Sequence, residues 1–156
     1  MDTQYPARRQ AVAERLAERN LQALVVSSPV NVRYLSGFTG SNALLVVFAA
    51  GQPVLFTDPR YGIQAARETS LRTRIVRGGP LAPAGIKAAA GRGRRRIGFE
   101  NLRIPFETHA RLSEALPLGA ELVPAGPLIE ELRMVKSPRE IEWIRRSAEV
   151  PISVTI

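Results

Sequence analysis

Short apolar runs alternate with amphipathic segments along most of the chain. Residues 21–26, 43–49 and 54–57 are runs of apolar and β-branched side chains, which are typical of strands buried in a sheet. The turn-forming residues 50–53 separate the second run from the third, so these two runs predict an antiparallel hairpin. Shorter runs that predict further strands lie at 74–76, 97–99 and 121–123.

Helical patterns lie between these runs. The first predicted helix covers residues 7–20, with Pro6 at its start and with Val12 and Leu16 on one apolar face. The remaining predicted helices cover 59–68, 81–90, 106–116 and 127–134. Strands that alternate with helices, together with one hairpin, predict an α/β fold in which helices flank a mixed sheet.

A further helix is predicted at the end of the chain. Ser137, Pro138 and Glu140 form the pattern of a capping box, which marks a helix N-terminus. An apolar stripe follows, made of Ile141, Ile144 and Ala148, bordered by Trp143 and ended by Pro151. Because a complete α/β unit precedes this helix, we expect the stripe to belong to a second domain. Residues 1–133 would form the first domain, and residues 134–156 the junction and the first helix of the next one.

The composition is that of a globular protein with one core. Of the 156 residues, 45% are hydrophobic and 23% are charged, and cysteine is absent, which excludes disulfides, thiolate metal sites and cysteine nucleophiles. The N-terminus lacks an apolar signal segment, and no apolar run approaches the roughly 20 residues that cross a bilayer. We therefore expect a cytoplasmic location and no membrane partner.

The net charge of +8 is carried mainly by arginine, and part of it lies in the run Arg92–Arg96. A basic run can bind nucleic-acid phosphates, so a nucleic-acid or protein-binding scaffold module is an alternative function. No aromatic residues lie between these arginines, and no nucleic-acid-binding motif accompanies them. We therefore expect a solvated loop before a strand, and we do not expect nucleic acid as a partner.

The residues that catalysis or metal binding requires are scarce. The chain has one histidine, His109, in a predicted helix, and it has no Gly-x-Ser-x-Gly elbow, Walker A sequence or His-Glu-x-x-His motif. Its only aspartates are Asp2 and Asp58. The sequence therefore predicts neither catalytic nor metal-binding residues in this chain.

Two stretches rich in polar and aromatic residues, 29–42 and 57–61, each follow the predicted carboxyl end of a strand, where open α/β sheets usually place their ligand sites. We expect both to be loops. A hairpin that turns near residue 50 would place Ala43 opposite Asp58 and would bring the two loops together at one edge of the sheet. The candidate binding residues in them are Asn31, Tyr34, Phe38, Arg60 and Tyr61.

The same residues also fit a structural role. Tyr34 and Phe38 could fill the core, Asn31 and Asp58 could form turns or caps, and Arg60 could be solvated. The pattern by itself favours neither interpretation.

The same stretches resemble the N-terminal domain of prolidases, aminopeptidase P and creatinase. The resemblance is carried by residues 31–41 (NVRYLSGFTGS), 57–61 (TDPRY) and 133–141 (RMVKSPREI), with IGFE at 97–100 between them. Together they extend the likeness over about residues 7–149. The family implies a ribonuclease-H-like α/β fold with a mixed sheet flanked by helices.

The resemblance also implies an activity for the parent protein. Members of this family carry a C-terminal pita-bread domain with two divalent metal ions, such as manganese, cobalt or zinc, that activate a water to attack the bond before proline. Their ligands would lie beyond residue 156, so we expect this chain alone to be inactive and without a cofactor. A creatinase-like parent, which uses the fold without metal, is the alternative.

The resemblance implies partners as well. We expect the catalytic domain of the same protein, a second copy in a homodimer, and a proline-containing peptide substrate. In similar enzymes the N-terminal domain leans over the substrate cleft, and Arg60 would there pair with a peptide carboxylate or carbonyl. Tyr34, Phe38 and Tyr61 would then wall the pocket.

Overall fold

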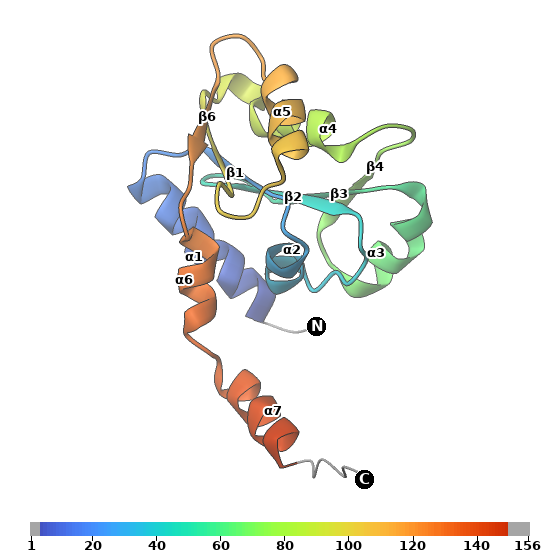
Figure 1. Cartoon of the computed structure of the whole chain (residues 1–156), viewed down its shortest axis with the longest axis vertical. Helices are drawn as coiled ribbons and strands as arrows, with labels where there is room; N and C mark the ends of the chain where they lie inside the picture. The colour runs from blue at the N-terminus through green and yellow to red at the C-terminus, as the bar shows by residue number, and fades with distance from the viewer. Residues whose placement is uncertain (1–3, 150–156) are drawn as a thin grey trace.

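The computed structural model describes residues 4–149, in which helices cover both faces of a mixed six-stranded sheet (Figure 1). In chain order the elements are α1 (Gln4–Glu18), β1 (Ala23–Val26), α2 (Pro29–Ser36), β2 (Ala43–Phe48), β3 (Val54–Thr57), the 3-10 turn η1 (Pro59–Tyr61), α3 (Gly62–Glu68), β4 (Arg72–Ile75), α4 (Leu81–Ala89), the 3-10 turn η2 (Gly91–Gly93), β5 (Arg96–Phe99), α5 (Phe106–Glu114), β6 (Glu121–Pro124), α6 (Leu128–Met134) and α7 (Pro138–Ala148). The strand order is β4-β3-β2-β1-β5-β6. Only β2 runs antiparallel to its neighbours, so the predicted α/β fold with a mixed sheet is confirmed.

The alternation of side chains along the strands divides the core into two layers. Leu24 and Val26 of β1 point to one face, which α1, α2, α3 and α6 cover, whereas Ala23 and Val25 point to the other face, under α4 and α5. On the first face Leu16 of α1 is fully buried. The central strands are buried on both faces, which explains why they are continuous apolar runs in the sequence.

The predicted hairpin of β2 and β3 is confirmed, but its register differs from the expected one by one residue. Ala43 lies opposite Thr57 and not opposite Asp58. Because side chains alternate across a sheet, a shift of one residue decides which face each side chain occupies. Thr57 is consequently buried, and its hydroxyl donates a hydrogen bond of 2.6 Å to the carbonyl of Asn42.

The expectation that residues 29–42 form a loop is wrong for their first half, which is helix α2. Pro29 occupies the first turn of the helix, and Val32 and Leu35 are buried against the sheet. Gly37 ends the helix in the left-handed conformation at a φ of 77°, and its N–H donates to the carbonyl of Arg33 at 2.8 Å. An eight-residue segment with weak helix propensity depends on this burial for its stability.

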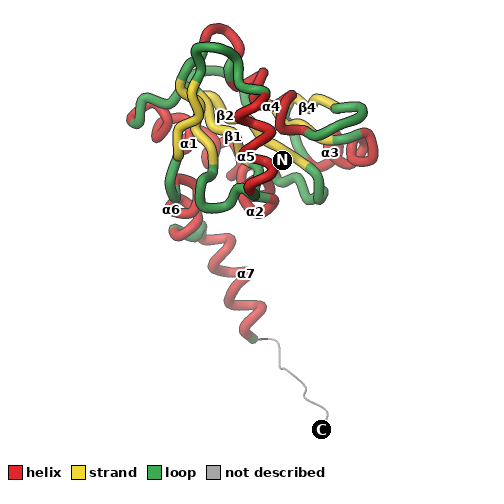
Figure 2. Tube along the Cα trace, turned by 45° about the horizontal axis from the view of Figure 1, so that its top comes forward, coloured by secondary structure: helices red, strands yellow, loops and turns green. Residues whose placement is uncertain are grey.

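The capping box that the sequence predicts before α7 is present. The N–H of Glu140 donates to the hydroxyl of Ser137, and the N–H of Ser137 donates to the carboxylate of Glu140 at 2.9 Å. Figures 1 and 2 show α7 projecting away from the body of the domain. Pro151, where the sequence predicts the end of this helix, lies outside the described residues.

Candidate functional site

Residues from three parallel strands meet at one edge of the sheet. β1, β3 and β5 run in the same direction, so the residues that follow them lie at the same edge. Residues 27–42 follow β1, residues 58–61 follow β3, and Glu100 follows β5. The prediction that the first two stretches meet is confirmed by direct contacts between them, and Glu100 is a third member that the sequence analysis did not single out.

The first group of contacts centres on Asp58. Its carboxylate accepts the backbone N–H of Arg60 at 2.9 Å, the guanidinium of Arg60 at 2.8 and 3.0 Å, and the side-chain amide of Asn42 at 2.6 Å. The hydrogen bonds from Arg60, and next those from Asn42, hold the pKa of Asp58 well below its usual range. Arg60 therefore has a fixed partner, yet its side chain is 74% exposed and keeps donors free for a ligand.

The aromatic residues of this group are held by close packing. The rings of Phe38 and Tyr61 meet edge to face, with centroids 6.0 Å apart, and the hydroxyls of Tyr61 and Ser41 are 2.6 Å apart. A Cβ added to Gly40 would overlap the Phe38 ring and lie 2.8 Å from the Tyr61 ring, so only glycine fits there. Phe38 is 1% exposed, which means that it supports the site from the core and cannot contact a substrate in this structure.

The second group centres on the buried carboxylate of Glu100. It accepts hydrogen bonds from the backbone N–H groups of Ser27 and Ser28 at 2.6 and 2.8 Å, and from the amide of Asn31 at 2.7 Å. Glu100 is 4% exposed, and this burial raises its pKa, although the hydrogen bonds from Asn31, Ser28 and Ser27 oppose the shift. The carboxylate thereby fixes the start of α2 to the end of β5.

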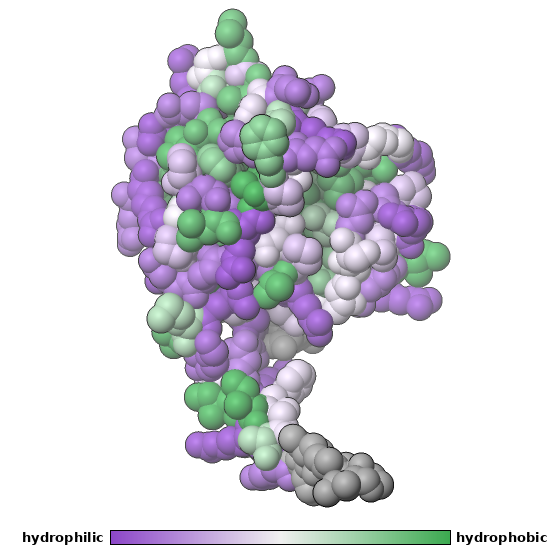
Figure 3. Space-filling view, in the orientation of Figure 1, coloured by the Kyte–Doolittle hydropathy of each residue, from purple (hydrophilic) through white to green (hydrophobic). Residues whose placement is uncertain are grey.

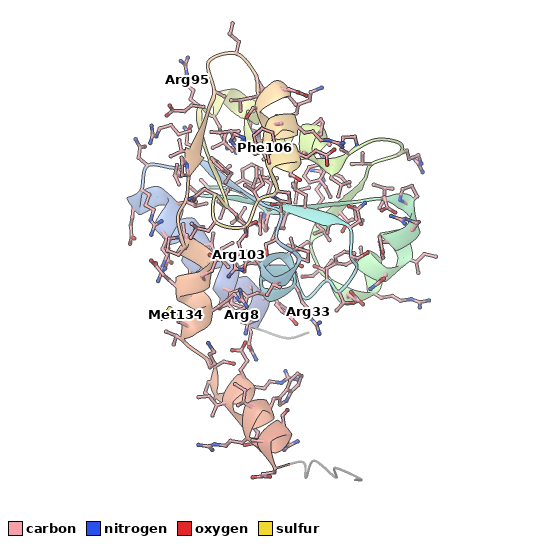
Figure 4. All side chains as sticks on the ribbon, in the orientation of Figure 1. Arg8, Arg33, Arg95, Arg103, Phe106 and Met134 are labelled. Carbon is pink, nitrogen blue, oxygen red and sulfur yellow. The ribbon has the colours of Figure 1, made fainter. Side chains whose placement is uncertain are left out.

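Asn31 connects this carboxylate to α6. Its amide also donates to Glu130 at 2.9 Å, and its carbonyl oxygen accepts from the guanidinium of Arg133 at 3.1 Å. Arg103 lies 3.4 Å from the same carboxylate of Glu130 (Figure 4). Asn31 is fully buried, so it acts as an internal connector and offers no surface to a substrate.

Tyr34 lies in a groove between the body and α7. The guanidinium of Arg8 stacks on the Tyr34 ring at 4.1 Å and forms an ion pair of 2.9 Å with Glu140 of α7. Burial raises the pKa of the Tyr34 hydroxyl, which donates to the carbonyl of Leu132 at 3.3 Å. The groove has a volume of about 330 Å³ and is lined by Gln4, Tyr5, Arg8, Val30, Arg33, Tyr34, Arg133, Arg139, Glu140 and Trp143. Figure 4 shows Arg8 and Arg33 on the side of the body that faces α7.

The candidate residues thus form two groups and not one pocket. Phe38, Arg60 and Tyr61 lie together beside α3, whereas Asn31 and Tyr34 face α6 and α1. The sequence analysis contained Glu100 only within the family motif at 97–100 and did not name it as a candidate, although an acidic residue directly after a predicted strand was a usable signal. Arg133 lay within the motif at 133–141 and was likewise not named as a candidate, since its link to Asn31 spans 102 positions.

The described residues do not fit a metal centre. Within residues 4–149 no three His, Cys, Asp or Glu side chains are gathered in a way that could hold a metal ion. His109 stacks against Phe99 with ring centroids 4.9 Å apart. No helix in the described part of the chain is long and apolar enough to cross a membrane.

Comparison with known proteins identifies a family and a relative of this chain. A family model described as the Creatinase/Prolidase N-terminal domain matches residues 8–135. The peptidase YqhT of Bacillus subtilis (strain 168) is 33% identical over 130 residues, which are 83% of this chain and 36% of that protein. The chain therefore spans about a third of the length of this relative.

Two solved structures have the same fold. The N-terminal domain of the cytoplasmic peptidase PepQ from Mycobacterium tuberculosis H37Rv is 38% identical, with a TM-score of 0.76 over 81% of this chain and 98% of that one. An X-Pro aminopeptidase from Thermotoga maritima MSB8 is 25% identical, with a TM-score of 0.74 over 86% of this chain but only 38% of that one.

Proposed function

The chain belongs to the Creatinase/Prolidase N-terminal domain family, and from this we propose that it is the non-catalytic domain of an Xaa-Pro metallopeptidase, where it covers the substrate cleft and takes part in dimerisation. The catalytic residues and the two metal ions would lie in a second domain of the same protein. The similarity to one part of a longer X-Pro aminopeptidase supports this division.

The observation that carries the proposal is the exposed apolar stripe of α7. Ile141, Trp143 and Ile144 are 41, 60 and 57% exposed, and Figure 3 shows an apolar patch on α7 beyond the body of the domain. An exposed apolar face on a helix with a complete capping box is typical of a surface that another part of the protein covers. The rest of a second domain, of which α7 would be the first helix, is the occupant that the position of α7 after residue 135 favours.

Catalysis by this chain alone is not expected, because its residues do not fit a metal pair. We expect no hydrolysis of Ala-Pro peptides above the blank and no stoichiometric binding of Mn²⁺ or Co²⁺ in calorimetry. Turnover by the isolated chain, or one bound metal pair per chain, would contradict the proposal that catalysis belongs to a second domain.

Arg60 is the residue that we propose for substrate contact. Its guanidinium is exposed at the carboxyl edge of the sheet, 5.5 Å from the ring centroid of Tyr61, and could pair with a terminal carboxylate or a backbone carbonyl. In the full-length peptidase, Arg60→Ala should raise KM about ten- to a hundredfold and leave metal content unchanged, because a charge-assisted hydrogen bond contributes roughly 1.5–3 kcal/mol.

A matched control separates this role from a structural one. Arg67→Ala removes another exposed arginine, on α3, that forms no ion pair with the described residues, and it should leave KM unchanged. If Arg60 only stabilises the Asp58 turn, Arg60→Ala should lower the melting temperature while KM stays constant. That outcome would end the case for a substrate contact.

A further inference from the structure

Five cationic side chains from three separate segments line one groove at the far end of the sheet from the candidate site. They are Arg72 and Arg74 of β4, Lys87 of α4, and Arg92 and Arg94 of the turn before β5. The groove also borders the β2–β3 turn and the first residue of β3, so it lies where β3 and β4 begin. Its volume is about 640 Å³, and none of the described residues that line it carries a carboxylate.

These cations are not neutralised within the domain. Among residues 4–149 none of the five forms an ion pair with Asp or Glu. They are five of the 22 lysine and arginine residues of a chain whose net charge is +8. Like charges that share one groove repel one another, and a bound polyanion would relieve that repulsion.

The basic run of the sequence is divided by the fold. Arg92 and Arg94 line the groove, whereas Arg96 pairs with Glu121 of β6. Arg95 is not among the lining residues, and Figure 4 shows it near the end of the molecule opposite α7. Arg92 adopts a φ of 62°, which is uncommon for a residue with a side chain, and Gly93 beside it has a φ of 74°. The groove is therefore assembled by tertiary structure and is not a property of the run.

The chemistry of the groove selects the class of ligand. Arginine binds phosphate oxygens through paired N–H donors, and four of the five cations are arginines. The aromatic residue in the wall, Phe48, is 8% exposed and is covered by the Arg94 guanidinium at 4.4 Å from its ring centroid. The groove therefore offers no open aromatic ring on which a base could stack, and the phosphates would be the main recognised group.

From these observations we propose that the basic groove binds oligophosphates, which are linear chains of two or more phosphate groups, either free or carried by a nucleotide. The volume lies in the range of small-molecule sites, about 300–1,000 Å³. The site is independent of the Xaa-Pro function proposed above, because it lies at the opposite end of the strands.

Calorimetry with this chain can test the proposal with tripolyphosphate, ATP and inorganic monophosphate as probes. We expect one tripolyphosphate per chain, bound at least about tenfold more tightly than monophosphate and weakened by added salt. ATP should bind within about threefold of tripolyphosphate, because the groove has no open aromatic ring to hold a base. Tighter binding of ATP by more than tenfold, or no binding of tripolyphosphate, would overturn the proposal.

A pair of double variants localises the binding. Arg72→Gln with Lys87→Gln removes two groove cations whose side chains form no hydrogen bond or ion pair among the described residues, and should weaken tripolyphosphate binding about tenfold. Arg67→Gln with Arg95→Gln lowers the net charge equally outside the groove and should change the affinity less than twofold. Equal losses in both double variants would mean that binding reflects net charge only, which refutes a site.

Two competitors exclude other polyanions. A single-stranded DNA 12-mer or a hexaglutamate peptide should displace tripolyphosphate only weakly at 0.15 M salt. If either one binds more than tenfold more tightly than tripolyphosphate, the groove serves nucleic acid or an acidic protein segment, and the oligophosphate assignment is wrong.

Discussion

Glu140 holds α7 against the body of the domain, and removing its charge should release the helix. Its carboxylate closes the capping box with Ser137 and forms the ion pair with Arg8 of α1. Glu140→Gln separates these two roles, because glutamine at this position still accepts the N–H of Ser137 but no longer attracts the guanidinium. The helix should therefore stay folded and lose its attachment to α1.

The expected magnitude follows from the exposure of the pair. The side chain of Arg8 is 14% exposed and that of Glu140 is 37% exposed, so solvent screens the interaction in part. We expect Glu140→Gln to reduce the free energy that attaches α7 to the body by about 1 kcal/mol, which corresponds to roughly a fivefold change in the docking equilibrium of α7. Trypsin cleavage after Lys136, in the junction before α7, should accelerate by the same factor, because cleavage follows the undocked population.

Two measurements and one control test this expectation. Trp143 is the only tryptophan and lies in the groove that α7 closes, so its fluorescence anisotropy reports the attachment directly. Glu142→Gln makes the same chemical change on the same helix, where Glu142 pairs with Arg146 away from the body, and should alter neither cleavage nor anisotropy. If Glu140→Gln and Glu142→Gln gave the same cleavage rate and the same anisotropy, the ion pair between Glu140 and Arg8 would not hold α7 to the body.

The attachment should also depend on pH in a defined direction. Burial raises the pKa of Glu140, but the hydrogen bonds from Ser137 and the charge of Arg8 outweigh it, and the pKa is lowered overall. A lowered pKa in the folded state means that the stabilisation is complete above the unfolded-state value of about 4.3 and is lost as the pH falls through the folded-state value. The difference in Trp143 anisotropy between the native chain and Glu140→Gln should vanish over that acidic range.

Three further changes test the packing of the domain. Gly40→Ala should lower the free energy of unfolding in urea by about 1–3 kcal/mol, because the new methyl group overlaps the Phe38 ring, whereas Gly91→Ala, with no atom within 4 Å, should be nearly neutral. Glu100 has a raised pKa, so its contribution to the free energy of unfolding is complete below about pH 4.3 and declines as the pH rises through the folded-state pKa. The free energy of unfolding of Glu100→Gln, relative to that of the native chain, should therefore increase from pH 4 to pH 7. A difference between the two chains that does not change with pH would contradict the burial argument. Ser137→Ala should reduce the helicity of α7 in circular dichroism, with a cost of about 1 kcal/mol, and unchanged helicity would show that the cap is dispensable.

Most elements of this fold could be predicted from the sequence because their signals are local. The apolar runs of β1, β2 and β3 are buried on both faces, and the capping box of α7 is complete within four residues. These patterns depend on side-chain periodicity and on backbone hydrogen bonds near in sequence, which a single chain displays without a partner. The resemblance of residues 31–41 and 133–141 to one family added the fold type, and the family is confirmed.

The remaining features were decided by tertiary contacts. α2 lacks a strong local signal and forms because Val32 and Leu35 are buried under the sheet. The hairpin register was displaced by one residue from the expected one, since turn geometry decides it and composition does not. Asn31 is a buried connector because Glu100 and Arg133 reach it from 69 and 102 positions away.

The same principle governs the charges. The run at 92–96 is visible in the sequence, but only the fold separates Arg94 from Arg96 and places it in a groove with cations of β4 and α4. Local periodicity specifies which segments are strands and helices. Which distant side chains share a site depends on strand order and register, and these are determined only when the whole sheet assembles.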